Sequence, residues 1–175
     1  MKNRMNLVLE NIKKRYSCRN YDNSRNINKN DLIKILEAAS NAPSGKNYQP
    51  WAFYINSDMK DIEYIASNSI YYDFISKSPC IVSIYLNKDI SYDYLKDSQA
   101  IGAAIQNILL AAHSLEIASC WVGEILKNKD KIEKFHNVDK QFELMAIITL
   151  GYETNCDSIK KTSRKNLDEL IIDWK

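Results

Sequence analysis

The segment from 96 to 117 constrains the fold more than any other part of the chain. Between Ser98 and Leu115 its only ionisable side chain is His113, and alanines alternate with isoleucines and leucines around the helix axis. A helix of this kind is predicted to be buried on most faces. A monomer of 175 residues has little apolar material to enclose about six turns of helix. We therefore expect a symmetric dimer with this helix at its centre. Ala104→Glu is expected to place like charges near the two-fold axis, or at least to bury an unpaired carboxylate.

Composition and targeting signals narrow the class of protein further. The apolar run approaches the minimum length of a membrane span. Several of its residues favour a buried helix of a soluble protein instead; these are Ser98, Gln99, Gly102, Gln106, Asn107 and Ser114. The first residues carry no apolar secretory segment. No CxxC pair occurs, so we expect no metal site. We expect the thiols to be reduced, as in a cytoplasm; they are Cys18, Cys80, Cys120 and Cys156. A net charge of +2 without a basic block argues against nucleic acid as a partner.

Hydrophobic periodicity predicts a mixture of helices and strands. Besides the long helix, we expect helices at 5–14, 30–40, from about 58, and 130–136, and strands at 51–55, 80–86 and 144–150. Gly151 is expected to end the last strand, and residues 15–27 to be irregular. The apolar tail at 167–174 requires a surface to pack on, either its own or that of a partner. The alternation predicts an α+β (mixed α/β) fold in one domain spanning 1–175.

Three segments carry the residue types of a binding site. Arg15 and Arg19 follow a helix and flank Ser17, a pattern suited to phosphate; a solvated basic helix end is the alternative. The loop 42–51 (APSGKNYQPW) holds two of the three prolines, and it is either a plain turn or a rigid platform for a planar heterocycle. The segment 118–124 (ASCWVGE) sets a tryptophan beside a glycine, which suits either a flat ligand or a core turn.

The order of these segments resembles the nitroreductase family of FMN flavoproteins. RYSCR is followed by APSGKNYQPW, an uncharged helix with GxxxQN at 102–107, SCWVG, TLGY and a C-terminal arginine. The resemblance covers about residues 10–170, and its most specific part is PSxxNxQPW. It implies a nitroreductase-like fold with a central, mostly antiparallel sheet flanked by helices. It also implies that the long helix lies at the interface of a homodimer, with FMN bound between the subunits.

The resemblance also implies which residues bind FMN noncovalently. Those matching the segments for the phosphate and ribityl chain are Arg15, Tyr16, Ser17, Arg19 and Arg164. Those matching the loop against the flavin are Pro43, Ser44 and Asn47, with Asn47 at the polar edge of the isoalloxazine. Those near the N5 side of the ring are Trp121, Val122 and Gly123, and the central helix adds Gln106. Lys161 departs from the family's basic pair and is not assigned as a ligand.

The family's chemistry implies ping-pong hydride transfer from NAD(P)H through the flavin to a flat, electron-poor small-molecule acceptor such as a nitroaromatic or quinone. The sequence has no GxGxxG fingerprint, and we assign no catalytic residue. Two alternatives stay open: a related flavoenzyme with one specialised substrate, such as a dehalogenase or dehydrogenase, and a non-catalytic flavin-binding or redox-sensing protein. In many larger members of the family, an inserted helical segment after the second strand shapes the substrate pocket. Here only the short stretch 87–96 occupies that place, which is compatible with the first alternative. Of the two histidines, His113 is expected in the core or interface and His136 at the surface.

Overall fold

The computed structural model describes residues 2–154 and 163–175. Its helices are α1 (Lys2–Lys14), α2 (Lys29–Ser40), α3 (Met59–Ser67), α4 (Tyr72–Ile75), α5 (Tyr94–Ser114) and α6 (Lys129–His136). Its strands are β1 (Tyr21–Asp22), β2 (Trp51–Asn56), β3 (Cys80–Asn87), β4 (Ala118–Val122) and β5 (Phe142–Glu153). Short 3-10 turns are η1 (Gly45–Asn47), η2 (Glu124–Asn128) and η4 (Leu167–Glu169).

The strands form one sheet in the order β1-β5-β3-β2, with β4 also paired to β5. Each of these pairings is antiparallel. The long β5 therefore organises the sheet, because it pairs with three other strands. The expected α+β fold with a central antiparallel sheet flanked by helices is confirmed.

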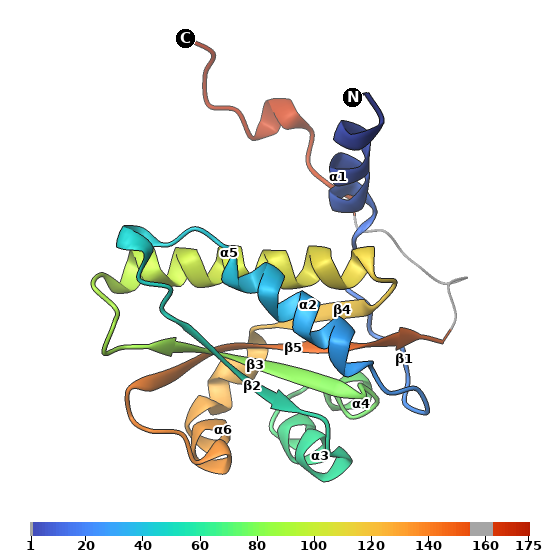
Figure 1. Cartoon of the computed structure of the whole chain (residues 1–175), viewed down its shortest axis with the longest axis vertical. Helices are drawn as coiled ribbons and strands as arrows, with labels where there is room; N and C mark the ends of the chain where they lie inside the picture. The colour runs from blue at the N-terminus through green and yellow to red at the C-terminus, as the bar shows by residue number, and fades with distance from the viewer. Residues whose placement is uncertain (1, 155–162) are drawn as a thin grey trace.

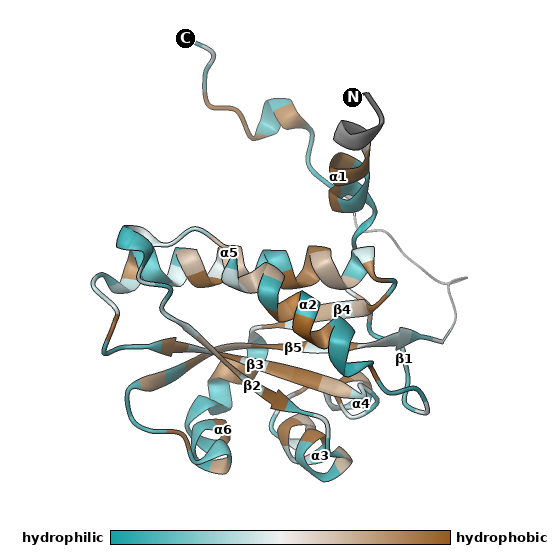
Figure 2. Ribbon diagram, viewed as in Figure 1, coloured by the Kyte–Doolittle hydropathy of each residue, from teal (hydrophilic) through white to brown (hydrophobic). Residues whose placement is uncertain are grey.

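Helices cover both faces of the sheet, with α2 and α5 on one side and α3, α4 and α6 on the other (Figure 1). Alternation along β3 explains the two layers, since successive side chains of a strand point to opposite faces. Val82 and Ile84 pack into the cluster beneath α2 and α5, whereas Ile81 and Tyr85 pack into the cluster on the other face. Figure 2 shows the resulting apolar centre of the sheet.

The last strand is longer than the sequence predicted, and Gly151 lies inside it rather than at its end. The glycine is needed for close packing. A Cβ added there would lie 2.6 Å from Cδ of Pro79 and 2.8 Å from Cδ1 of Tyr21. Gly151 therefore marks the close approach of two side chains to the backbone, while the strand continues to Glu153.

The long helix begins at Tyr94 and ends at Ser114, whereas we expected 96–117. Asp93 caps its start by accepting a hydrogen bond from the Lys96 backbone nitrogen. The chain then leaves the helix axis with Glu116 in the left-handed region (φ 60°) and enters β4, which periodicity did not reveal. No helix among the described residues has both the length and the apolar character needed to cross a membrane.

One face of α5 is already buried within the protomer. Ala104 is fully buried, in the same apolar cluster as Ile35 and Ala39 of α2. Because its own protomer encloses Ala104, a glutamate at this position would bury an unpaired carboxylate, and the place of a two-fold axis stays a prediction. Gly102 and Ala103 are half-buried and Gln106 is exposed, so this side of the helix is the one open to a partner.

The two terminal segments extend past α5, away from the sheet (Figure 1). Both expose apolar side chains: Leu7 of α1 is 65% exposed and Trp174 of the tail is 83% exposed. Others exposed on these segments are Val8, Leu9, Ile12, Leu167, Leu170 and Ile172.

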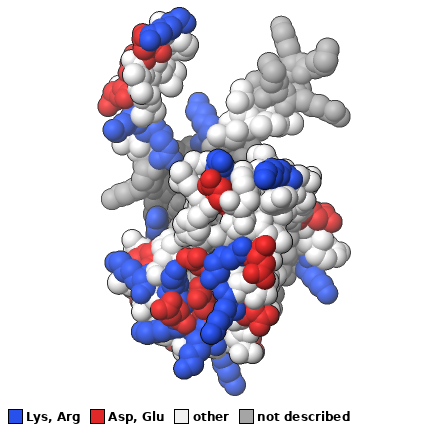
Figure 3. All heavy atoms as spheres, turned by 90° about the vertical axis from the view of Figure 1, so that its left-hand side faces the viewer, with Lys and Arg blue, Asp and Glu red and all other residues white. Residues whose placement is uncertain are grey.

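Figure 3 views the molecule from the end that carries η1, where acidic and basic side chains are interspersed.

Candidate functional site

The segment that follows α1 is fixed beside β4. The Cys18 backbone nitrogen donates to the Ser119 carbonyl (3.0 Å), and Cys18 itself is buried. Further along, the Tyr21 hydroxyl lies 2.8 Å from Oγ1 of Thr149 in β5. Side chains alternate in an extended segment, so the burial of Cys18 leaves Ser17 and Arg19 exposed.

Three of the expected phosphate ligands, Arg15, Ser17 and Arg19, lie on the segment that runs beside β4. Burial raises the pKa of the Cys120 thiol. The Arg19 charge, the Ser17 hydroxyl and the Arg15 charge oppose that rise in pKa. The Cys18–Ser119 backbone bond holds their segment beside β4, and Arg19 lines a hollow together with Cys120. Burial also lowers the pKa of His113, and the positive charge of Arg15 lowers it further. Two guanidinium groups and a hydroxyl form a donor set that suits a phosphate.

The end of β4 meets this cationic region. A hollow of about 210 Å³ is lined by Arg19, Phe74 and the consecutive residues 120–124. Arg19 also lies over the Phe74 ring, 5.9 Å from its centroid. The structure therefore brings the expected phosphate segment and the expected N5-side segment together.

The three residues of the N5-side segment differ in what they offer a ligand. Trp121 is 44% exposed, and its ring lies 3.9 Å from the position of a Cβ added to Gly102 of α5. Gln106 follows Gly102 by four residues, so both lie on the same face of the helix. The Val122 side chain is buried in the core, which leaves only its backbone available. Nothing lies within 4 Å of a Cβ added to Gly123, so the space beside its backbone is open.

The loop around η1 has an unusual backbone. Lys46, Asn47 and Gln49 all have positive φ angles of 53°, 57° and 49°. Non-glycine residues rarely adopt this region, and strained backbone of this kind concentrates at functional sites. Ser44 Oγ accepts from the Gln49 backbone nitrogen (2.9 Å), and Pro43 and Asn47 are exposed. The loop is therefore held in shape while its polar groups face outward.

Within one protomer the expected ligands fall into two groups at opposite ends of α5. Asn11 of α1 donates to the Leu110 carbonyl (3.0 Å) near the C-terminal end, close to where Arg15 follows. The loop at 43–49 lies at the N-terminal end (Figure 1). A helix of 21 residues spans roughly 30 Å. One protomer thus does not bring Asn47 to the cations near Arg15.

The remaining expected ligands are less closely tied to these two groups. Tyr16 hydrogen-bonds Glu153 and lines a cavity of about 520 Å³, together with His113 and Arg25. It therefore turns to the opposite side of its segment from Ser17. Arg164 is exposed on the C-terminal tail. Lys161 and Cys156 lie outside the described residues.

His136 is buried, so the expectation of a surface position was wrong. It is 6% exposed, stacks on Tyr54 at 3.9 Å between ring centroids, and its Nδ1 lies 2.6 Å from the Tyr85 hydroxyl. Burial lowers its pKa to about 4. The sequence did contain a signal, because Ile132 lies four residues earlier on the same face of α6 and is also buried.

The antiparallel sheet between two helical layers defines an α+β domain. Its candidate binding residues lie on a cationic segment beside β4 and on a strained polar loop at the far end of α5. The model of the family described as "Nitroreductase family" matches residues 12–71 and 63–152. The chain belongs to the nitroreductase family, and it is an oxidoreductase of the flavin-dependent type.

Named relatives agree with this assignment. A provisionally named NADH dehydrogenase/NAD(P)H nitroreductase of Methanothermobacter thermautotrophicus is 32% identical over 150 residues, covering 83% of this chain and 76% of the relative. One of the same name from Archaeoglobus fulgidus is 29% identical, covering 85% and 86%. A provisionally named nitroreductase from Desulfovibrio desulfuricans, solved in complex with FMN, superposes with a TM-score of 0.89 at 32% identity, covering 96% of each chain.

Proposed function

We propose that the protein is an FMN-dependent oxidoreductase that takes hydride from NAD(P)H and passes it to a flat, electron-poor acceptor such as a nitroaromatic or quinone. It acts as one domain per subunit of a homodimer. The observation that carries the proposal is that the segment with Arg15, Ser17 and Arg19 is held beside β4, where Arg19 lines a hollow next to the open backbone at Gly123. A relative of the same fold at 32% identity was solved with FMN.

The residues present fit a mononucleotide. Arg15 and Arg19 carry the charge that a terminal phosphate requires, and the Ser17 hydroxyl adds a donor. The open backbone beside Gly123 would be available to a flat ring, and the buried side chain of Val122 would leave its backbone available as well. Bound FMN would supply the chemistry, accepting hydride at N5 and passing it on in a second half-reaction. The chain's own task is to hold, orient and shield that group.

A second copy of the chain would complete the site. The loop with Asn47 lies at the other end of α5 from Arg15, so in a two-fold dimer the loop of one subunit is available to the cations of the other. The exposed apolar side chains of α1 and the tail support this arrangement. A helix of 13 residues with one apolar face in water is marginal by itself, so we expect the partner to cover it.

The assembly proposal is tested with Leu9→Asp and Leu170→Asp, which place a charge on each terminal segment. Met59→Asp is the matched control, because Met59 is 45% exposed at the start of α3, in the opposite helical layer. In sedimentation, wild type and control are expected as dimers, and both test variants as monomers that lose flavin. A wild-type monomer that retains FMN would contradict the dimer.

The cofactor proposal is tested by the visible spectrum of the purified protein, followed by heat release and chromatography of the flavin. FMN is the expected product, and FAD as the dominant flavin would refute it. Stopped-flow oxidation of NADH and NADPH then separates an enzyme from a flavin-binding sensor, which would react slowly. Turnover of one acceptor among many would favour a specialised enzyme. The free, buried thiols Cys18, Cys80 and Cys120 fit a reducing compartment, and we place the protein in the cytoplasm.

A further inference from the structure

We propose that Tyr92 clamps the loop 43–49 in the conformation that meets the flavin, and that the buried carboxylate of Asp97 positions Tyr92 for this task. Tyr92 lies in the short connection between β3 and α5, and Asp97 lies in the first turn of α5. The inference rests on the proposed function, since it concerns how the flavin loop is held.

The loop requires support from outside itself. Three non-glycine residues in the left-handed region, Lys46, Asn47 and Gln49, make its backbone unfavourable unless the surroundings enforce it. Four hydrogen bonds lie within the loop. The backbone nitrogens of Asn47 and Tyr48 donate to the carbonyls of Ser44 and Gly45 (3.1 Å each), Ser44 Oγ accepts from Gln49 N, and Gln49 Nε2 donates to the Asn47 carbonyl at 3.2 Å. Gln49 and Asn47 are exposed, so water competes for these bonds.

Tyr92 supplies that support by packing directly on the loop. A Cβ added to Gly45 would lie 2.0 Å from the Tyr92 hydroxyl oxygen and 2.5 Å from its Cε1, so the ring covers the Gly45 backbone. The ring also meets Tyr48 edge to face at 5.7 Å between centroids. The Lys46 ammonium lies 5.0 Å from the ring centroid. One aromatic side chain thus contacts three residues of the loop, two of them next to Asn47.

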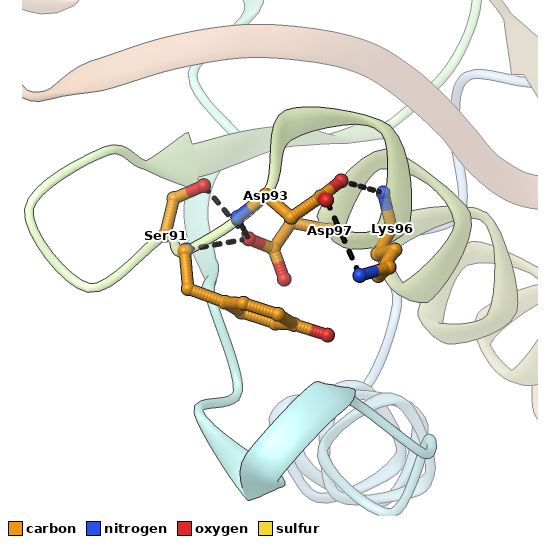
Figure 4. A network of polar contacts seen from close by, with 5 residues as sticks. Ser91, Asp93, Lys96 and Asp97 are labelled. Carbon is orange, nitrogen blue, oxygen red and sulfur yellow. Dashed lines mark hydrogen bonds and ion pairs between the residues drawn. The ribbon is translucent and has the colours of Figure 1, made fainter.

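Asp97 in turn fixes the backbone that carries Tyr92. Its carboxylate is fully buried, and one oxygen, Oδ2, accepts three hydrogen bonds (Figure 4). The donors are the Ser91 hydroxyl (2.7 Å) and the backbone nitrogens of Tyr92 (3.0 Å) and Asp93 (3.2 Å). A single acceptor therefore defines the turn 91–93 and the direction in which Tyr92 leaves it.

The burial of Asp97 is costly, which supports a positioning role. Its other oxygen, Oδ1, is buried without a hydrogen-bond partner in the part of the chain that the structure describes. Burying a carboxylate is unfavourable unless hydrogen bonds compensate it. The three bonds to the turn are that compensation, so the carboxylate and the turn hold each other in place. Loss of Asp97 is expected to release Tyr92, and through it the loop.

The test compares FMN binding in four variants by fluorescence titration, together with the visible spectrum of the bound flavin. Tyr92→Ala and Asp97→Ala should raise the dissociation constant by about tenfold or more, because a loop no longer preorganised must be ordered on binding. Asp97→Asn keeps the accepting oxygen and should recover most of the affinity. Tyr92→Phe keeps the ring and should resemble wild type.

Two controls separate positioning from general damage. Tyr94→Ala removes a neighbouring exposed tyrosine whose hydroxyl bonds Glu143 rather than the loop. Asp93→Ala removes the helix cap but leaves the Asp97 acceptor and the Tyr92 backbone nitrogen. Both are expected to keep the wild-type affinity and flavin spectrum, even where Asp93→Ala lowers the thermal midpoint.

The outcomes distinguish the two proposals. A wild-type protein that does not bind FMN overturns the proposed function. Wild type that binds FMN, with unchanged affinity and spectrum in Tyr92→Ala, overturns the clamp alone. If Tyr92→Ala weakens binding and Asp97→Asn does not recover what Asp97→Ala loses, the role given to Asp97 is wrong. Should Asp97→Ala fail to fold, Tyr92→Ala against Tyr94→Ala still decides the clamp.

Discussion

Acidification should destabilise this protein through His136, and the structure gives the sign. The ring is buried between Tyr54 and Tyr85, and its Nε2 has no hydrogen-bond partner among residues 2–154 and 163–175. A protonated ring would bury a positive charge whose Nε2–H has no acceptor among these residues, so the folded state keeps the imidazole neutral. Its pKa is about 4 when folded, against 6.5 for an unperturbed histidine.

The magnitude follows from proton linkage. The difference between 6.5 and about 4 is about 2.5 units, and each unit corresponds to about 1.36 kcal/mol, which gives about 3 kcal/mol. Because the folded pKa of His136 lies below the unfolded one, its contribution to the free energy of unfolding is fully present above pH 6.5. It declines as the pH falls from 6.5 towards 4, and this contribution is fully lost below about pH 4.

Urea unfolding at several pH values between 7 and 4 measures the effect in wild type and in His136→Gln. The other histidine, His113, and all carboxylates remain in both proteins, so their titration largely cancels in the difference. Wild type should lose about 3 kcal/mol more than the variant over this range, whatever their stabilities at pH 7. Parallel curves for the two proteins would refute the reasoning.

Two further predictions concern the phosphate segment and the close packing of β5. Arg15→Ala should weaken FMN binding by about 1.5–3 kcal/mol, roughly tenfold to more than a hundredfold, the scale of a hydrogen bond to a charged group. Fluorescence titration checks it against Lys13→Ala, which removes an exposed cation of α1, and equal affinities would remove Arg15 from the site. Gly151→Ala should destabilise the fold by about 1–3 kcal/mol, because the added methyl meets Pro79 at 2.6 Å. Urea unfolding tests this against Gly123→Ala, where nothing lies within 4 Å, and a stable Gly151→Ala protein would show that Pro79 yields.

The sequence by itself determined the elements whose signal is local. The long helix, the strand at 80–87 and most of β5 follow from runs of apolar residues that report burial along one stretch of chain. The same holds for the ordered set of segments with Arg15, Asn47 and Trp121, whose spacing carried the family resemblance. These features depend on neighbours in sequence, so a one-dimensional pattern contains them.

Only the tertiary structure decided the features that depend on distant partners. β1 and β4 are strands because β5 pairs with them, and neither has a periodicity of its own. Gly151 lies within a strand because Pro79 and Tyr21 approach it. His136 is buried because Tyr54 and Tyr85 stand opposite it on the sheet. Ala104 is buried in the core beneath α2 and α5. The phosphate segment and the η1 loop lie at opposite ends of α5. Chain reversals set which segments meet, and no local pattern records those reversals.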